Sequence, residues 1–163
     1  VKLHKKKNLI AQFKKYYPEF QVQVMTQNLR SEALDFSKSL LDSRPKRSKT
    51  LDQEFLAIRT GFDYFDDLNL KGLVLMLNGQ LIAYAVFSRI SESTYDIQFE
   101  KADPRFKGAA QVINHETAKY LRGKCLFVNR EQDLGIKGLR QAKLSYDPVD
   151  LPTSYGLKFN TPN

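Results

Sequence analysis

The sequence predicts an α+β fold in which helices cover both faces of a mixed β-sheet. The Asn78-Gly79 dipeptide joins two apolar runs, which is the strongest short-range signal for a β-hairpin. Both runs are apolar at consecutive positions, which indicates a sheet that is buried on both faces. A strand, a helix and another strand follow at the spacing of a crossover, so these two strands are expected to be parallel.

The first part of the chain is predicted to form a helix, a strand and a second helix. Residues 5–17 carry an apolar stripe opposite several lysines, and Pro18 ends this helix. Residues 20–25 alternate between apolar and polar side chains, as a half-buried strand does. The second helix is expected to begin at an Asn28 cap. Its apolar stripe consists of Leu29, Ala33, Phe36 and Leu40.

A basic loop over residues 42–49, broken by Pro45, leads to a third helix. Thr50 and Gln53 have the spacing of a capping box, so we expect the helix to begin there. Its stripe is the longest in the chain and consists of Leu51, Phe55, Ile58, Phe62 and Phe65.

The second half is predicted to contain the rest of the sheet. The hairpin strands are residues 73–77 and 81–87, and a further strand ends at Asp103-Pro104. That strand is expected to place Tyr95, Ile97 and Phe99 on one face and Asp96, Gln98 and Glu100 on the other. The remaining predicted elements are a helix over residues 109–121, a buried strand over 125–128 that contains Cys125, a short helix over 136–144 and a last strand over 155–159.

The net charge of +8 is concentrated in two places. One is the stretch of residues 1–15, with Lys2, Lys5, Lys6, Lys7, Lys14 and Lys15, and the other is the loop with Arg44, Lys46, Arg47 and Lys49. Without these ten residues, the chain has 16 basic and 18 acidic residues and is therefore close to neutral. Such deposits are either solvated faces or surfaces that attract an anionic partner such as nucleic acid or phospholipid.

The composition excludes several classes of protein. No apolar run approaches the roughly 18 residues of a membrane span. Two distant histidines and one cysteine leave no ligand set for zinc, so no metal site is predicted. The lone cysteine is typical of a reducing compartment, so we expect a cytoplasmic protein. The chain opens on Val1 with no initiator methionine, so we take it as an internal start, either a trimmed chain or a piece of a longer protein.

Two neighbouring regions could carry chemistry. The turn that enters the helix at residue 109 offers backbone amides and a helix dipole to an anion, and its residues are Arg105, Lys107, Gly108, Ala109 and Ala110. The alternative is a glycine that merely starts a helix. Glu100 lies at the carboxyl end of one strand, and Asn129, Arg130, Glu131 and Asp133 follow the end of the next parallel strand, where open sheets place ligands. The alternative there is an ordinary loop with ion pairs.

The meander, the crossover and the Arg-x-x-Gly-x-Ala turn at residues 105–110 resemble the GNAT-type acyltransferase fold. The segments Phe99-Glu-Lys-Ala-Asp-Pro, Gln111-Val-Ile-Asn-His-Glu and residues 127–146 are similar to a bacterial family of unknown function. That family is related to the carboxyl-terminal domain of phosphatidylglycerol lysyltransferases. The resemblance implies a single GNAT-like domain over residues 1–163, the carboxyl-terminal half of a tandem two-lobed protein, with residues 1–17 as a basic connecting helix.

The resemblance also implies roles for individual residues. Glu100 would be the catalytic base and Tyr146 the acid. The turn, together with Asn129, would bind the donor, with acyl-CoA as a co-substrate and no tightly bound cofactor. The turn has one glycine and a bulky Phe106, which departs from the pattern of coenzyme A sites. In aminoacyl-transferring relatives a basic helix meets transfer RNA, which would give that task to Lys5, Lys6, Lys7, Lys14 and Lys15.

Two functions therefore remain open. The first is an enzyme that moves an acyl or aminoacyl group from acyl-CoA or aminoacyl-tRNA to an amine or hydroxyl. The second is a GNAT-like module without catalysis that contacts RNA or an anionic lipid surface through its basic helix. In both cases the expected partner within the protein is an amino-terminal GNAT-like half.

Overall fold

The computed structural model describes residues 3–46, 48–133, 135–153 and 155. The chain forms two compact units. One is His4–Gln132, and the other comprises Val1–Leu3 and Asp133–Asn163. Among the described residues, the sheet lies in the first unit, and the second unit contains one helix.

The first unit is built on a five-stranded sheet with the strand order β1-β2-β3-β4-β5. The strands are β1 (Gln21–Val24), β2 (Lys71–Leu77), β3 (Gln80–Arg89), β4 (Thr94–Ala102) and β5 (Phe127–Asn129). Strands β1 to β4 are antiparallel neighbours, and β5 is parallel to β4, as the crossover pattern predicts. At the hairpin, Asn78 and Gly79 have φ of 51° and 78°, the left-handed values that a two-residue turn of this type requires.

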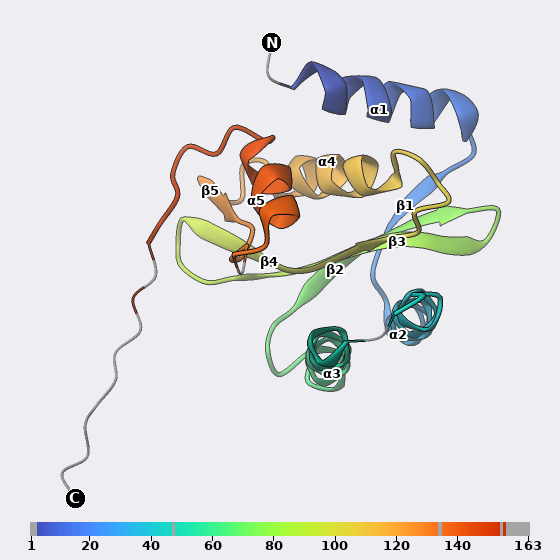
Figure 1. The fold of residues 1–163 in the computed structure, drawn as a ribbon, viewed down its shortest axis with the longest axis horizontal. Coiled ribbons are helices and arrows are strands. Elements are labelled where there is room, and N and C mark those ends of the chain that lie inside the picture. Colours follow the sequence, from blue (N-terminus) through green and yellow to red (C-terminus); the bar gives the residue numbers. More distant parts are fainter. Residues whose placement is uncertain (1–2, 47, 134, 154, 156–163) are drawn as a thin grey trace, which may run out of the picture. The chain divides into compact units, whose positions relative to one another are not determined.

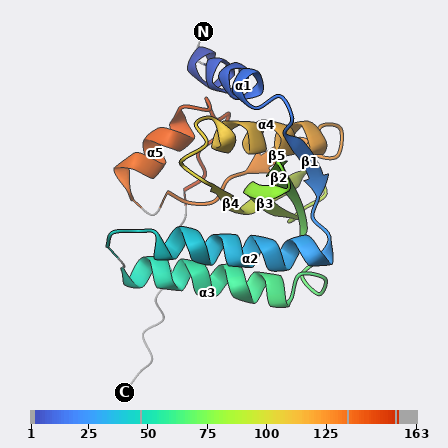
Figure 2. The same ribbon diagram turned by 90° about the vertical axis from the view of Figure 1, so that its right-hand side faces the viewer.

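Helices lie on both sides of the sheet (Figures 1 and 2), so the predicted α+β architecture is confirmed. Helices α1 (His4–Tyr16) and α4 (Ala109–Leu121) lie on one side, and α2 (Gln27–Asp42) and α3 (Lys49–Asp63) lie on the other. Each side has its own apolar core. Phe13, Phe87 and Ile113 are fully buried on the α1 and α4 side, and Val74, Tyr84 and Ile58 are buried on the α2 and α3 side. Burial on both faces explains why β2 and β3 have no polar alternation.

Two helix starts differ from the prediction. Helix α2 begins after Thr26 rather than at an Asn28 cap, and Asn28 lies inside the helix. Helix α3 is capped by Ser48, whose side chain accepts a hydrogen bond from the backbone N–H of Leu51, so Thr50 belongs to the first turn. Ser48 and Thr50 are both favourable capping residues, and the path of the preceding loop decides between them.

The predicted alternation of β4 is wrong because the strand contains a β-bulge. Val86 pairs with Phe99 and Phe87 pairs with Ile97, which leaves Gln98 as the extra residue. Ile97 therefore packs in the α1 and α4 core, whereas Phe99 packs against the α2 and α3 core. The residues beyond the bulge are displaced by one position, so the side chain of Glu100 reaches α4 and that of Lys101 reaches α3.

The end of the crossover also differs from the prediction. Strand β5 begins at Phe127, and all three of its residues are exposed rather than buried. Cys125 precedes the strand and is half-buried, with its Sγ 3.8 Å from the carbonyl oxygen of Leu121. A three-residue strand after a glycine turn covers too little of the sheet to be enclosed.

In the second unit, α5 (Lys137–Leu144) confirms the predicted short helix. Its amino-terminal flank is tied together by Asp133, which accepts a hydrogen bond from the backbone of Gly135 and lies 3.7 Å from Arg140. The last predicted strand, over residues 155–159, lies outside the described residues except for Tyr155.

Candidate functional site

Glu100 lies at the centre of a polar group on the edge of the sheet. Its Oε2 accepts a hydrogen bond of 3.0 Å from Asn114 Nδ2 of α4, and its Oε1 accepts one of 3.1 Å from Arg130 Nη2. The Glu100 side chain is 18% exposed, so it is shielded but reachable. A carboxylate has about four lone-pair positions. These two hydrogen bonds therefore leave acceptor capacity for a further donor.

The position of Glu100 follows from the short β5. Strand β5 pairs only with Thr94, Tyr95 and Asp96 of β4. Among the described residues, no strand continues along the same edge of β4 beside residues 97–102. The chain leaves β5 at Asn129, and the next residue, Arg130, reaches back to Glu100. The two strands thus separate just before the carboxylate, which opens this edge to a ligand.

Lys6 of α1 belongs to the same neighbourhood. Burial and the guanidinium of Arg130 lower the pKa of Lys6 below its usual value, and the Glu100 carboxylate acts in the opposite direction. Lys6 is half-buried, unlike Lys5 and Lys7 beside it. The inner face of α1 therefore contributes a cation to the region around Glu100.

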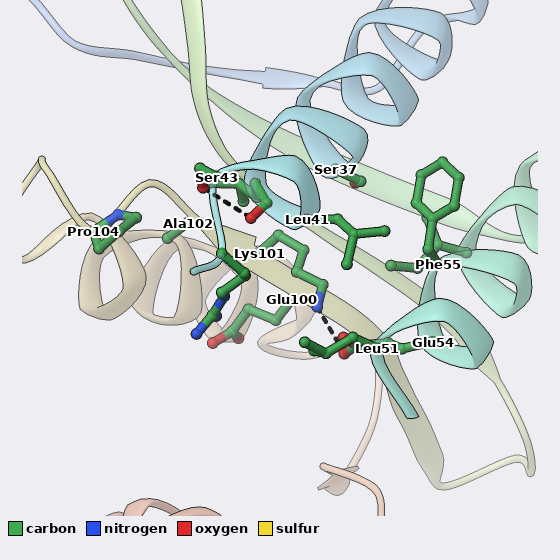
Figure 3. A pocket seen from close by; sticks show the side chains of 13 residues that line it. Ser37, Leu41, Ser43, Leu51, Glu54, Phe55, Glu100, Lys101, Ala102 and Pro104 are labelled. Atoms are coloured by element: carbon green, nitrogen blue, oxygen red, sulfur yellow. Dashed lines mark hydrogen bonds and ion pairs between the residues drawn. The ribbon is translucent and has the colours of Figure 1, made fainter. Parts of the chain in front are cut away.

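A pocket of about 420 Å³ lies on the face of the sheet that α2 and α3 cover, between the end of α2, the helix α3 and the end of β4 (Figure 3). Glu100 and Lys101 line it from β4, and Glu54 and Phe55 line it from α3. Lys101 Nζ lies 2.7 Å from Glu54 Oε1, the ion pair that Figure 3 shows as a dashed line. Glu100 is thus the residue that the pocket shares with the Asn114 and Arg130 group.

The turn at residues 105–110 is tightly packed against α1. A Cβ on Gly108 would lie 2.7 Å from the carbonyl oxygen of Leu9 and 3.0 Å from Cβ of Phe13. The ring of Phe106 packs edge-on against Tyr17 at 5.6 Å, and Ala109 is fully buried. The small residues of the turn therefore accommodate a helix.

The charges of this turn are also engaged within the protein. Arg105 binds both carboxylate oxygens of Asp103, with Nη2 at 2.6 Å from Oδ2 and Nε at 3.0 Å from Oδ1. Asp103 is 3% exposed, and the hydrogen bond from the Arg105 side chain holds the pKa of its carboxyl below the usual value. Lys107 is exposed and Ala110 is half-buried. The assignment of donor binding to these residues and to Asn129, which pairs with Asp96, stays a prediction.

The five lysines of α1 do not share one role. Lys14 lies 3.3 Å from Glu116 of α4, and Lys6 faces the Glu100 region. Lys5, Lys7 and Lys15 are exposed, so these three present their charge to solvent. Nucleic-acid binding by any of the five stays a prediction.

Tyr146, the predicted acid, lies in the second unit, directly after α5, where its backbone N–H donates to the carbonyl oxygen of Lys143. Its catalytic role stays a prediction. Sequence reasoning did not single out Asn114 or the Glu54–Lys101 pair. Asn114 directly follows the buried apolar residues Val112 and Ile113 and is itself half-buried. A polar residue beside the buried face of a helix was the signal that could have identified it.

Within the described ranges, no three histidine, cysteine, aspartate or glutamate side chains gather as a metal site would require. Over the same part of the chain, no helix is long and apolar enough to cross a membrane.

Comparisons with known proteins agree with the fold. The family model described as phosphatidylglycerol lysyltransferase, C-terminal, matches residues 1–156. A conserved protein of unknown function from Bacteroides thetaiotaomicron is 34% identical with a TM-score of 0.85. The alignment covers 92% of this chain and 51% of that protein, so this chain spans about half of its length. No curated protein matches the chain.

More distant solved structures are acetyltransferases. A ribosomal-protein-alanine N-acetyltransferase from Brucella melitensis is 13% identical, with a TM-score of 0.60 over 86% of this chain and 99% of that one. The aminoglycoside N-acetyltransferase AAC(6')-Iy, solved in complex with CoA, is 12% identical, with a TM-score of 0.57 over 88% and 95%. At these identities the likeness shows the fold alone, and that fold is the GNAT-type fold.

Proposed function

Because the chain belongs to the phosphatidylglycerol lysyltransferase C-terminal family, we propose that it is an acyl- or aminoacyl-transferring domain that moves an acyl group from an activated donor to an amine or hydroxyl. The observation that carries the proposal is the placement of Glu100. Its carboxylate is oriented by Asn114 and Arg130 at the open edge of β4, and Glu100 is also one of the residues that line the 420 Å³ pocket.

The proposed chemistry is a single displacement. The acceptor's amine or hydroxyl enters from the pocket and gives a proton to Glu100 as its nitrogen or oxygen attacks the carbonyl carbon of the donor. A new bond forms to the acceptor, and the bond from the carbonyl carbon to the donor's leaving atom breaks; that atom is an oxygen in an aminoacyl-tRNA and a sulfur in acyl-CoA. Tyr146 is proposed to return a proton to the leaving atom. Arg130 is close enough to Glu100 to stabilise negative charge that develops beside it.

The donor that we propose is an aminoacyl-tRNA. The turn at residues 105–110 is packed under α1, which argues against a coenzyme A pyrophosphate there. Lys5, Lys7 and Lys15 present positive charge to solvent on the same helix, and such charge suits a phosphate backbone. Acyl-CoA is the second donor to test. The Bacteroides relative is about twice as long as this chain, and the matching family is described as C-terminal; together these support an amino-terminal half as the partner.

Glu100→Gln in the full-length protein tests the function. Transfer of the amino acid from a charged tRNA pool, or of the acyl group from acyl-CoA, is measured as loss of the donor ester or thioester in the presence of mixed acceptors. We expect a loss of about 100-fold or more, because a positioned base contributes roughly 10² to 10⁴. Glu19→Gln, an exposed residue away from the site, is the matched control. Unchanged transfer in Glu100→Gln would remove the base role.

A module without catalysis is the second candidate, and one observation favours it. Both oxygens of Glu100 already accept hydrogen bonds within the protein, as they would in a purely structural ion pair. This candidate predicts no turnover by the full-length protein with either donor, together with salt-dependent binding to RNA or to anionic vesicles.

A further inference from the structure

The pocket beside Glu100 has an uncharged part around Ser37. Ser37 Oγ donates to the carbonyl oxygen of Ala33 at 2.7 Å, so the hydroxyl of Tyr84, also 2.7 Å away, must donate to Ser37. Burial raises the pKa of Tyr84 far above its usual value, so this phenol stays protonated. The neighbouring walls are apolar and consist of Leu41, Leu51, Phe55 and Ile58.

Most of the charged side chains that line the pocket lie where α3 meets the end of β4. Glu54 and Glu100 line it from opposite elements, and Lys101 Nζ lies 2.7 Å from Glu54 Oε1 (Figure 3). Glu100 is already held by Asn114 and Arg130. Glu54 is 48% exposed and Lys101 is 24% exposed, and a partly exposed pair of this kind contributes little to stability. The ion pair can therefore be exchanged for another at small cost.

We propose that Glu54 selects a ligand with a primary ammonium group on an apolar body, and that Lys101 occupies the ammonium position when the ligand is absent. Lys101 is an ammonium on a flexible four-carbon chain. A ligand ammonium that replaces it leaves the charge on Glu54 compensated, while Lys101 turns to solvent. The apolar body of the ligand then lies against Leu51, Phe55 and Ile58.

An anionic ligand fits the same residues poorly. To bind Lys101 it would have to draw that ammonium away from Glu54, and the ligand would then lie close to the uncompensated carboxylate. Arg44 also lines the pocket, at the end of α2, so the charge balance by itself does not decide between the two ligand classes. The existing ammonium contact on Glu54 is the observation that favours the amine.

The inference rests on the proposed function in one respect, since an amine bound at Glu54 would lie in the pocket that Glu100 also lines and would be the acceptor of the proposed transfer. The binding itself is measured without any transfer reaction. Calorimetric titration of the full-length protein compares three probes with the same phenyl body, namely phenethylamine, 2-phenylethanol and 3-phenylpropionate. We expect phenethylamine to bind most tightly.

Two substitutions change this affinity in opposite directions. Glu54→Gln should weaken phenethylamine binding about tenfold, because the variant cannot form the charged hydrogen bond. Lys101→Met should strengthen it, since the competing ammonium is removed while the apolar stem is kept. A misfolded variant cannot gain affinity, so the Lys101 variant keeps the test independent of folding. Glu32→Gln on the exposed face of α2 carries the same charge change and should leave affinity unchanged.

The inference is overturned by equal binding of the three probes, by tighter binding of 3-phenylpropionate, or by unchanged amine affinity in Glu54→Gln. Its failure is distinct from failure of the proposed function. If Glu100→Gln abolishes transfer but the titration shows no preference for the amine, the proposed enzymatic function stands and the amine subsite is refuted. If the titration shows a clear preference for the amine but neither donor supports transfer, the amine subsite stands and the proposed enzymatic function is refuted.

Discussion

Gly108 has a conformation and a contact that both exclude a side chain. Its φ is +97°, a value that residues with a Cβ rarely adopt, and the backbone of α1 lies against its Cα. A glycine at the start of a helix indicates that another group approaches its backbone closely. From the sequence alone, that group could equally be a ligand phosphate or the backbone of another segment. The structure identifies the neighbouring group as Leu9.

Gly108→Ala should lower the free energy of unfolding by about 2 to 5 kcal/mol, from the left-handed φ together with the clash. Gly123→Ala is the matched control, because Gly123 has a φ of +77° and no heavy atom within 4 Å of the added Cβ. It should cost only about 1 to 2 kcal/mol. Urea unfolding of the two variants measures the difference. Equal losses of stability would mean that α1 does not rest on this turn.

Asp103 makes stability depend on pH in the acidic range. The Arg105 side chain lowers the pKa of this buried carboxyl, so the folded state binds fewer protons than the unfolded state at low pH. The contribution is fully present above the unfolded-state pKa, about 3.9, and is lost as the pH falls through the lower folded-state pKa. The difference in unfolding free energy between the wild type and Asp103→Asn should therefore shrink below about pH 4. A difference that is constant down to about pH 3 would contradict this.

At the scale of elements, α3 shows how far local sequence determines a helix start. The apolar stripe predicts the helix, but Ser48 and Thr50 compete for its cap, and only Ser48 has the extended backbone of a capping residue (φ −133°, ψ 152°). Ser48→Ala should cost about 1 kcal/mol, measured by chemical unfolding. Thr50→Ala should cost a few tenths of a kcal/mol or less, because Thr50 lies in the first turn. The reverse order would place the cap at Thr50.

Strand β4 shows what element patterns miss. Its alternating sequence predicts a regular strand, whereas the bulge at Gln98 moves Phe99 onto the α3 side, where a Cβ on Gly61 would lie 2.9 Å from its ring. Bulges carry no strong local pattern, because they arise from fitting one strand to its neighbours and to the covering helices. The bulge also determines which side each of the next residues faces, so that Glu100 reaches α4 and Lys101 reaches α3.

At the scale of the whole molecule, the net charge of +8 does not measure the cationic surface that a partner meets. Lys14 pairs with Glu116, and Lys6 faces Glu100 and Arg130. The triple variant Lys5/Lys7/Lys15→Ala should weaken tRNA binding by the full-length protein at low salt. It should also reduce the slope of log affinity against log salt by roughly 0.7 to 0.9 for each phosphate that the protein no longer neutralises. Filter binding at several salt concentrations measures both.

Lys71→Ala, a change on the exposed first residue of β2, is the control and should leave the salt slope unchanged. An unchanged slope in the triple variant would remove RNA as the partner of these three lysines.

The sequence by itself determined most of the described elements and the parallel crossover, because these depend on periodicity, turn residues and the density of apolar side chains along the chain. The GNAT-type fold was expected from the resemblance of particular segments to a known family. The sequence also placed Glu100 at the end of its strand. Only the tertiary structure decided what surrounds that carboxylate. Asn114, Arg130 and Lys6 come from three separate segments, and a bulge turns Glu100 toward them. Likewise, only packing decided that Gly108 supports a helix, because its neighbour Leu9 belongs to a distant part of the chain.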